Sequence, residues 1–118
     1  MLFRSGERLR AGLHERARAN GFTLRQSGPV QMPLFLFEED VDLRLGFRWS
    51  SEMLQRGVYV HPWHNMFLSA AMSVEDIDRA LEAAEGAFAA LKACRANLGP
   101  QEKVLAFFTH RRLQSALR

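Results

Sequence analysis

Apolar side chains recur at helical spacing in three long stretches of the chain, so that each stretch would have one buried face. The first covers residues 5–20, where Leu9, Leu13 and Ala17 follow one another every four residues. Gly21 then suits a helix end, because glycine accepts the left-handed backbone found there. The pattern predicts a helix over residues 5–20 with a charged outer face.

Two further helices are predicted by the same reasoning. Residues 43–56 have apolar rows and are followed by Gly57, again where a helix would end. Residues 74–93 follow Ser73, and Asp76 stands three positions later, which is capping-box spacing. The last helix has one apolar stripe, formed by Ile77, Ala80, Leu81, Ala84, Phe88 and Leu91.

Strand patterns lie between the helices. Residues 22–26 alternate apolar and polar side chains, residues 27–29 form a Ser-Gly-Pro turn, and residues 30–37 form a second apolar strand. Pro33 cannot donate a ladder hydrogen bond, so we expect it at the start or edge of that strand. Residues 58–60 and 67–70 are two further short strands predicted on either side of a polar, aromatic bend.

This order of elements predicts an α+β fold, with a small, mainly antiparallel sheet and helices packed on one side. Gly99 and Pro100 then break the chain. Residues 101–117 are predicted to form an extra C-terminal helix with a basic end.

Length and composition indicate one globular domain. The chain has 118 residues, of which 47% are hydrophobic and 25% charged. We expect no transmembrane helix, because no apolar run reaches about 18 residues. The first residues do not have the pattern of a secretory signal. Cys94 is the only cysteine, which fits a reducing cytoplasm.

Positive charge is concentrated near the C-terminal end. Residues 95–118 carry five basic residues and one acidic residue, a net charge of +4, whereas the whole chain has +3. Residues 1–94 therefore have a net charge of −1. A near-neutral domain with a basic tail does not have the basic face of a nucleic-acid-binding module, so we expect no nucleic-acid partner.

The segment that includes the bend is similar to a segment of a known enzyme family. Its sequence is Gly-Val-Tyr-Val-His-Pro-Trp-His-Asn-Met-Phe-Leu-Ser over residues 57–69, and Ser-Val-Glu-Asp-Ile-Asp follows at residues 73–78. This segment resembles the C-terminal part of class III aminotransferases that depend on pyridoxal phosphate (PLP). The resemblance is nearest to the glutamate-1-semialdehyde aminomutase-like branch.

The resemblance implies that residues 1–94 form the small C-terminal domain of such an enzyme. It covers residues 5–93, whereas the basic tail over residues 95–118 lies outside it. In the family this small domain packs against a large PLP-binding domain within a homodimer. The chain is therefore interpreted as a fragment of a PLP-dependent aminotransferase or aminomutase.

The family's catalytic lysine, which binds PLP as a Schiff base, has no counterpart here. The two lysines, Lys92 and Lys103, occupy a helix end and the tail. The sequence also has no glycine-rich phosphate loop. We therefore predict no catalytic and no cofactor-binding residue in this chain, which by itself would not complete a transamination cycle.

The bend is the best candidate for a functional site. The resemblance implies that His64 and Asn65 line the mouth of the substrate pocket in a complete enzyme. Semialdehyde aminomutases have a longer bend with a glutamate, and Met72 stands where the family commonly has a histidine. The alternative interpretation is that the polar side chains of the bend only satisfy backbone groups.

A metal site is not predicted. His61 and His64 form a pair, but zinc sites need three or four ligands, and Cys94 lies at a distant helix end.

The other polar or aromatic candidates have structural interpretations that we favour. Trp63 would be a buried anchor of the bend rather than an exposed interface residue. Arg44 and Arg48, which have the chemistry to bind a carboxylate, are predicted on a solvated helix surface away from the bend. Residues 38–40 (Glu-Glu-Asp) are predicted to be a solvated turn rather than an acid-base pair.

A second hypothesis makes the chain a non-enzymatic, self-associating α+β interaction domain. Both hypotheses imply exposed apolar surface, so we expect a homodimer. The residues predicted to form its contact are Trp63, Met66, Val104, Phe107 and Phe108.

Overall fold

Three α-helices and one β-hairpin form the described part of the computed structural model, which comprises residues 2–64, 66, 68–69 and 71–99. Their order along the chain is α1 (Leu2–Ala19), β1 (Leu24–Ser27), β2 (Leu34–Phe37), α2 (Arg44–Gln55), α3 (Val74–Cys94) and a 3-10 turn, η1 (Arg95–Asn97).

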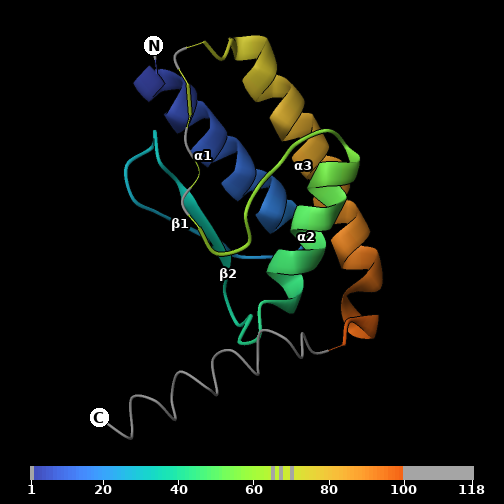
Figure 1. Ribbon diagram of the computed structural model, residues 1–118. Helices are drawn as coiled ribbons and strands as arrows, with labels where there is room; N and C mark the ends of the chain where they lie inside the picture. Colours follow the sequence, from blue (N-terminus) through green and yellow to red (C-terminus); the bar gives the residue numbers. More distant parts are fainter. Residues whose placement is uncertain (1, 65, 67, 70, 100–118) are drawn as a thin grey trace, which may run out of the picture.

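Helix α3 packs against both other helices, and the hairpin lies beside α1 and α2 (Figure 1). The helices predicted over residues 5–20, 43–56 and 74–93 are confirmed, although α1 begins earlier than expected. The capping box of α3 is also confirmed. The Ser73 hydroxyl accepts a hydrogen bond from the Asp76 backbone N–H at 3.2 Å, and the Asp76 carboxylate accepts one from the Ser73 N–H at 2.8 Å.

The hairpin is antiparallel, with Leu24 opposite Phe37 and Gln26 opposite Phe35. Because side chains alternate across a strand, these four residues share one face, and Leu24, Phe35 and Phe37 are buried there. Strand β2 begins directly after Pro33, as predicted for a residue without a backbone N–H. The α+β class is thus confirmed, with a sheet of two strands among the described residues.

The two additional strands predicted at residues 58–60 and 67–70 are not formed among the described residues. The backbone N–H groups of Met66 and Leu68 do donate to the carbonyls of Pro33 and Gln31, at 2.7 and 2.8 Å. A regular antiparallel pair would return a bond from residue 33, but proline has no N–H. Proline thus accounts for the missing bond at residue 33, and Gln31, which does have an N–H, returns no bond to Leu68 either.

Aromatic rings fill the centre of the core between the hairpin, α2 and α3. Trp49 of α2 stacks on Phe88 of α3 with ring centroids 5.2 Å apart, and it meets Phe35 and Phe37 edge to face. Phe22 completes the cluster against Phe37. These contacts fix α2 relative to the hairpin.

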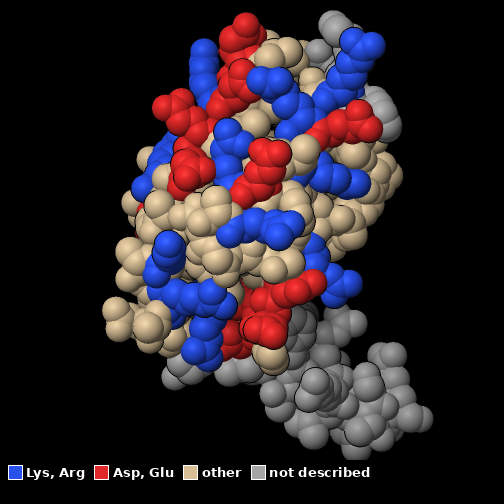
Figure 2. Space-filling model, turned by 180° about the vertical axis from the view of Figure 1, so that it is seen from behind, with Lys and Arg blue, Asp and Glu red and all other residues tan. Residues whose placement is uncertain are grey.

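On the surface, basic and acidic side chains are interspersed over the face opposite to that of Figure 1 (Figure 2). Ion pairs join α1 to α3, such as Arg8 with Asp78 at 2.8 Å. None of the described helices is long and apolar enough to cross a membrane. The predicted helix over residues 101–117 lies outside the described residues.

Candidate functional site

The bend at residues 61–64 lies against the first turns of α2. The Trp63 ring meets the Phe47 ring of α2 with centroids 5.3 Å apart. A side-chain carbon added at Gly46 would lie 3.6 Å from the Pro62 carbonyl oxygen. The Ser50 hydroxyl of α2 donates a hydrogen bond to the Val60 carbonyl at 3.1 Å, at the residue just before the bend. Helix α2 thus adjoins the bend, contrary to the separation predicted from the sequence.

His61 is half-buried and serves the backbone of the bend. Its Nδ1 accepts a hydrogen bond from the Trp63 backbone N–H at 3.2 Å, so that in the neutral ring the proton is on Nε2. Burial lowers the pKa of His61, and the nearby His64 ring lowers it further. Both effects favour a neutral imidazole near pH 7.

His64 is exposed, and its ring lies 4.6 Å from that of His61. Its side chain has only ring contacts, and no hydrogen bond, within the described part of the chain. Asn65, the other predicted pocket residue, lies outside the described residues.

Trp63 is 42% exposed, so the prediction of a buried anchor was wrong. Its ring packs edge to face on Phe47 and His61, which covers part of the ring and leaves the rest at the surface. The physical reason is that the bend lies against the outer part of α2, where Trp63 meets Phe47, a ring that is itself only partly buried.

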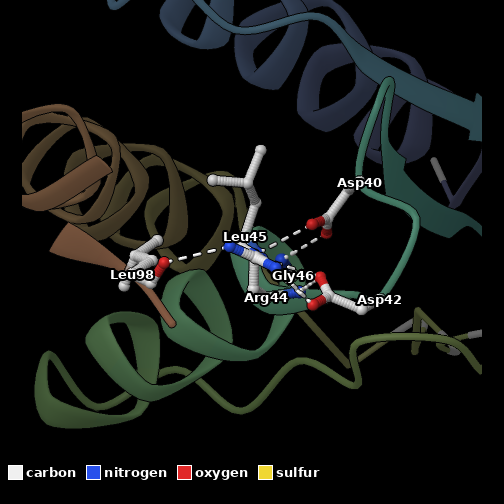
Figure 3. Close-up of polar contacts among 6 residues, drawn as sticks. All are labelled: Asp40, Asp42, Arg44, Leu45, Gly46 and Leu98. Carbon is white, nitrogen blue, oxygen red and sulfur yellow. Dashed lines mark hydrogen bonds and ion pairs between the residues drawn. The ribbon is translucent and has the colours of Figure 1, made fainter. Parts of the chain in front are cut away.

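The N-terminus of α2 is closed by acidic residues (Figure 3). The two carboxylate oxygens of Asp40 accept the backbone N–H groups of Leu45 at 2.9 Å and Gly46 at 2.8 Å. Glu38 and Glu39 lie in an exposed turn, as predicted, whereas Asp40 is a helix-capping residue and departs from that interpretation. The backbone donors of this helix end are unavailable to an anion.

Arg44 forms an ion pair with Asp42 at 2.7 Å and donates to the Leu98 carbonyl at 3.1 Å (Figure 3). It thereby links the start of α2 to the segment after α3. Arg48 instead pairs with the buried carboxylate of Glu52 at 3.0 Å. Both arginines are engaged within the fold, so neither is simply a solvated side chain.

A metal centre is not formed by the described residues, in which no group of three or more His, Cys, Asp or Glu side chains converges. His61 and His64 remain a pair.

The described residues do not fit PLP. Lys92, the one lysine among them, is exposed on the outside of α3. Two helix N-termini that would suit a phosphate are occupied by carboxylates, Asp40 on α2 and Asp76 on α3. No step of PLP chemistry follows from these residues.

An apolar cavity of about 350 Å³ lies beside the bend. Its wall includes the two segments that flank the bend, residues 57–60 together with Met66 and Leu68. Trp49 of α2 and Ala80 of α3 also line it. The sequence did not predict this cavity, because it forms where α1, β2, α2, α3 and the segments that flank the bend meet.

Two curated relatives match most of the chain. The aminopentol aminotransferase of Sphingopyxis macrogoltabida is 48% identical over 99 residues, which cover 84% of this chain and 24% of the relative. Glutamate-1-semialdehyde 2,1-aminomutase 2 of Anoxybacillus flavithermus is 34% identical over 104 residues, covering 77% of this chain and 24% of the relative. No family model matches the sequence.

Solved structures agree with these matches. The PLP internal aldimine form of the FumI protein of Sphingopyxis sp. MTA144 superposes with a TM-score of 0.84 and 47% identity, covering 87% of this chain and 25% of that one. An omega-transaminase from Sphaerobacter thermophilus superposes with a TM-score of 0.63 at 21% identity, covering 74% and 23%, and shows the shared fold.

Fold and sequence together define this chain as a homologue of one part of the class III PLP-dependent aminotransferases. It spans about a quarter of the length of the relatives it matches, so it corresponds to a fragment of such an enzyme. A quarter of the enzyme does not hold the cofactor alone.

Several residues that shape the site were missed from the sequence. Asp40 acts from outside the usual capping position, since Leu43 directly precedes α2 with a φ of 60° and has no capping side chain. No standard capping spacing marks it. Glu52 carried no signal beyond its spacing of four residues from Arg48 and Arg56.

Proposed function

We propose that this chain is the small C-terminal domain of a PLP-dependent class III aminotransferase and acts only together with the rest of that enzyme. The observation that carries the proposal is the superposition on the FumI protein, with a TM-score of 0.84 at 47% identity. A complete enzyme of this kind would supply the lysine and the phosphate site that the described residues do not provide.

The substrate we propose is a hydroxylated amine rather than a semialdehyde. The 48% identical relative is by its name an aminotransferase for an aminopentol, whereas the aminomutase is 34% identical. The bend also departs from the aminomutases, because it is shorter and has no glutamate. Neutral imidazole and amide groups form hydrogen bonds with hydroxyl groups without adding charge.

Within that enzyme, His64 and Asn65 would line the mouth of the substrate pocket. The exposed His64 side chain supports this role, because it forms no hydrogen bond with the described backbone that would explain it structurally. His61, by contrast, satisfies a backbone N–H of the bend. The structural alternative thus explains His61 better than His64.

A chimera tests the proposal. The 99 residues of the Sphingopyxis macrogoltabida aminotransferase that match this chain would be replaced by their counterparts from this chain. We expect a folded enzyme that transaminates aminopentol. His64→Ala should lower kcat/KM about 10-fold or more, as expected when a substrate-positioning hydrogen bond is lost, whereas the exposed control Glu75→Gln should not. A folded but inactive chimera would contradict the proposal.

The cytoplasm is the proposed location, since Cys94 is a free, half-buried thiol. A second candidate function, self-association as a non-enzymatic domain, is favoured by exposed apolar side chains such as Tyr59 and Trp63. It predicts an assembly of identical chains without the rest of the enzyme.

A further inference from the structure

A second cavity, of about 560 Å³, lies between α1 and the hairpin. The part of α1 that lines it is a stripe at helical spacing, which consists of Glu7, Arg10, Ala11 and His14. Strand β1 contributes Leu24 and Gln26, which lie on the same face of the hairpin. This cavity shares no lining residue with the one beside the bend, so the two are separate.

Hydrogen bonds hold the polar groups of the second cavity in place. Arg10 Nη2 donates to the Gly28 carbonyl at 2.7 Å, and Gln26 Nε2 donates to the Arg10 carbonyl at 2.7 Å. Gly6 lets α1 approach the loop after β1, because a side-chain carbon there would lie 2.5 Å from the Val30 carbonyl oxygen. The Arg10 guanidinium and the Gln26 amide are therefore fixed relative to each other by the fold.

One buried donor and one buried acceptor of this cavity have no partner within the described part of the chain. They are the Arg10 Nε–H and Gln26 Oε1. Buried polar atoms are nearly always hydrogen-bonded, because an unpaired one loses its interaction with water and gains nothing in return. A ligand that satisfies both atoms must offer an acceptor to Arg10 and a donor to Gln26.

The charges of the cavity narrow the choice of ligand. Neither Arg10 nor the exposed Glu7 forms an ion pair with another described residue. The Arg10 guanidinium favours an anionic acceptor such as a carboxylate. Glu7, on the same stripe of α1, opposes a simple anion and favours a cationic donor such as an ammonium group. The buried Leu24 and the partly buried Val30 add an apolar wall.

We propose that this second cavity binds an aliphatic α-amino acid in its zwitterionic form. The carboxylate accepts the Arg10 Nε–H, the ammonium group donates to Gln26 Oε1 and pairs with Glu7, and the side chain packs on Leu24 and Val30. A water molecule would also offer a donor and an acceptor, but it is uncharged and takes only about 30 Å³. One amino acid accounts for the two unpaired atoms, the two unpaired charges and the apolar wall. Its binding needs no other part of an aminotransferase, so the site stands apart from the proposed function.

The first experiment tests the two charged groups of the ligand separately. L-Leucine would be titrated into the isolated chain, with the backbone amide shifts followed by NMR. Isocaproate is leucine without its ammonium group, and isoamylamine is leucine without its carboxylate. We expect leucine to shift the amides around Arg10 and Gln26 saturably, and each analogue to bind about tenfold or more weakly. Equal binding of either analogue, or no saturable shift with leucine, would overturn the proposal.

The second experiment tests the residues that hold the two charges. Arg10→Lys keeps a positive charge without the Nε–H, and it should weaken binding of both leucine and isocaproate about tenfold. Glu7→Gln should weaken leucine about threefold, the size of an exposed ion pair, and leave isocaproate no weaker. Glu15→Gln and Arg18→Lys are the matched controls, since both residues are exposed on α1 outside this cavity.

Leucine affinities that are equal in these variants and in their controls would show that the cavity does not read the two charges, which overturns the proposal. Circular dichroism establishes that each variant is folded. If Arg10→Lys does not fold, the exposed Glu7→Gln substitution and the two leucine analogues decide the outcome.

Discussion

Glu52 is a carboxylate in the interior, with 6% of its surface exposed. Arg56 donates to it at 2.8 Å and Arg48 at 3.0 Å, and Gly86 of α3 leaves room for the Arg56 side chain. The Arg56 hydrogen bond lowers the pKa of Glu52 despite its burial, and Arg48 lowers it further. Burial of a charge is tolerated here because both of its oxygens are paired.

Replacing this carboxylate by an amide, Glu52→Gln, should lower the free energy of unfolding by about 1–3 kcal/mol at neutral pH, because two charge-assisted bonds are weakened. Because the pKa of Glu52 is lower in the folded state, the carboxylate contributes its full stabilisation at pH values above the ordinary carboxyl pKa of about 4.5. That stability is lost as the pH falls through the folded-state value.

The difference between wild type and Glu52→Gln should therefore shrink in acid. Urea unfolding at a series of pH values measures it, with the exposed Glu82→Gln as control. A difference that stayed constant from neutral to strongly acid pH would show that the ion pairs contribute nothing.

The two imidazoles of the bend provide a second test at this scale. Because the His64 ring lowers the pKa of His61, His64→Ala should raise it toward the ordinary value. Burial would still hold it below that value. Imidazole proton shifts followed by NMR against pH report this directly, and an unchanged His61 titration would mean that the two rings do not interact.

Between elements, the contact of α1 with α3 depends on a glycine. A side-chain carbon at Gly12 would lie 2.5 Å from a methyl group of Leu81, which is 5% exposed. Alanine is more favourable than glycine in a helix interior by about 1 kcal/mol. Overpacking a core contact, however, costs about 1–3 kcal/mol. We therefore expect Gly12→Ala to lower the free energy of unfolding by up to about 2 kcal/mol, because the overpacking cost offsets the gain in helix propensity.

A double-mutant cycle separates these two effects. In a Leu81→Ala background the clash is absent, so Gly12→Ala should become stabilising there. Gly99→Ala, which meets no atom within 4 Å, is the control. Denaturant unfolding of the four proteins would contradict the packing argument if Gly12→Ala had the same effect in both backgrounds.

For the whole molecule, the absence of a cofactor lysine gives a prediction about PLP. The chain alone should not form a stoichiometric Schiff base with PLP, because Lys92, the one lysine among the described residues, is exposed on the surface of α3. Absorbance spectroscopy with added PLP measures this. A one-to-one Schiff-base band that disappeared in Lys92→Arg would contradict the prediction, whereas weak, unsaturable adducts would not.

Assembly gives a further prediction for the whole molecule. We expect the isolated chain to form a dimer through its exposed apolar surface. The half-exposed Trp63 ring lies in the bend, and the partly buried Met66 lines the neighbouring cavity. The other predicted contact residues, Val104, Phe107 and Phe108, lie outside the described residues. Light scattering over a wide concentration range tests this, and Trp63→Ser should weaken the dimer. A strictly monomeric chain would show that this surface does not self-associate.

The sequence by itself determined the elements whose signals are local. The apolar rows of α1, α2 and α3, the Ser73 and Asp76 capping box, and the effect of Pro33 on β2 all depend on residues a few positions apart. The likeness to the aminotransferases was also readable, because it rests on a contiguous motif at residues 57–69.

Only the tertiary structure decided the features that join distant residues. It brought Phe47 against Trp63, let Asp40 cap a helix from outside the usual position, and buried Glu52 between two arginines. It also left residues 58–60 without a strand partner. Forming a strand requires a neighbouring strand to pair with, and the β-propensity of the residues themselves does not provide one. Such contacts depend on how helices and hairpin pack, which local periodicity does not encode.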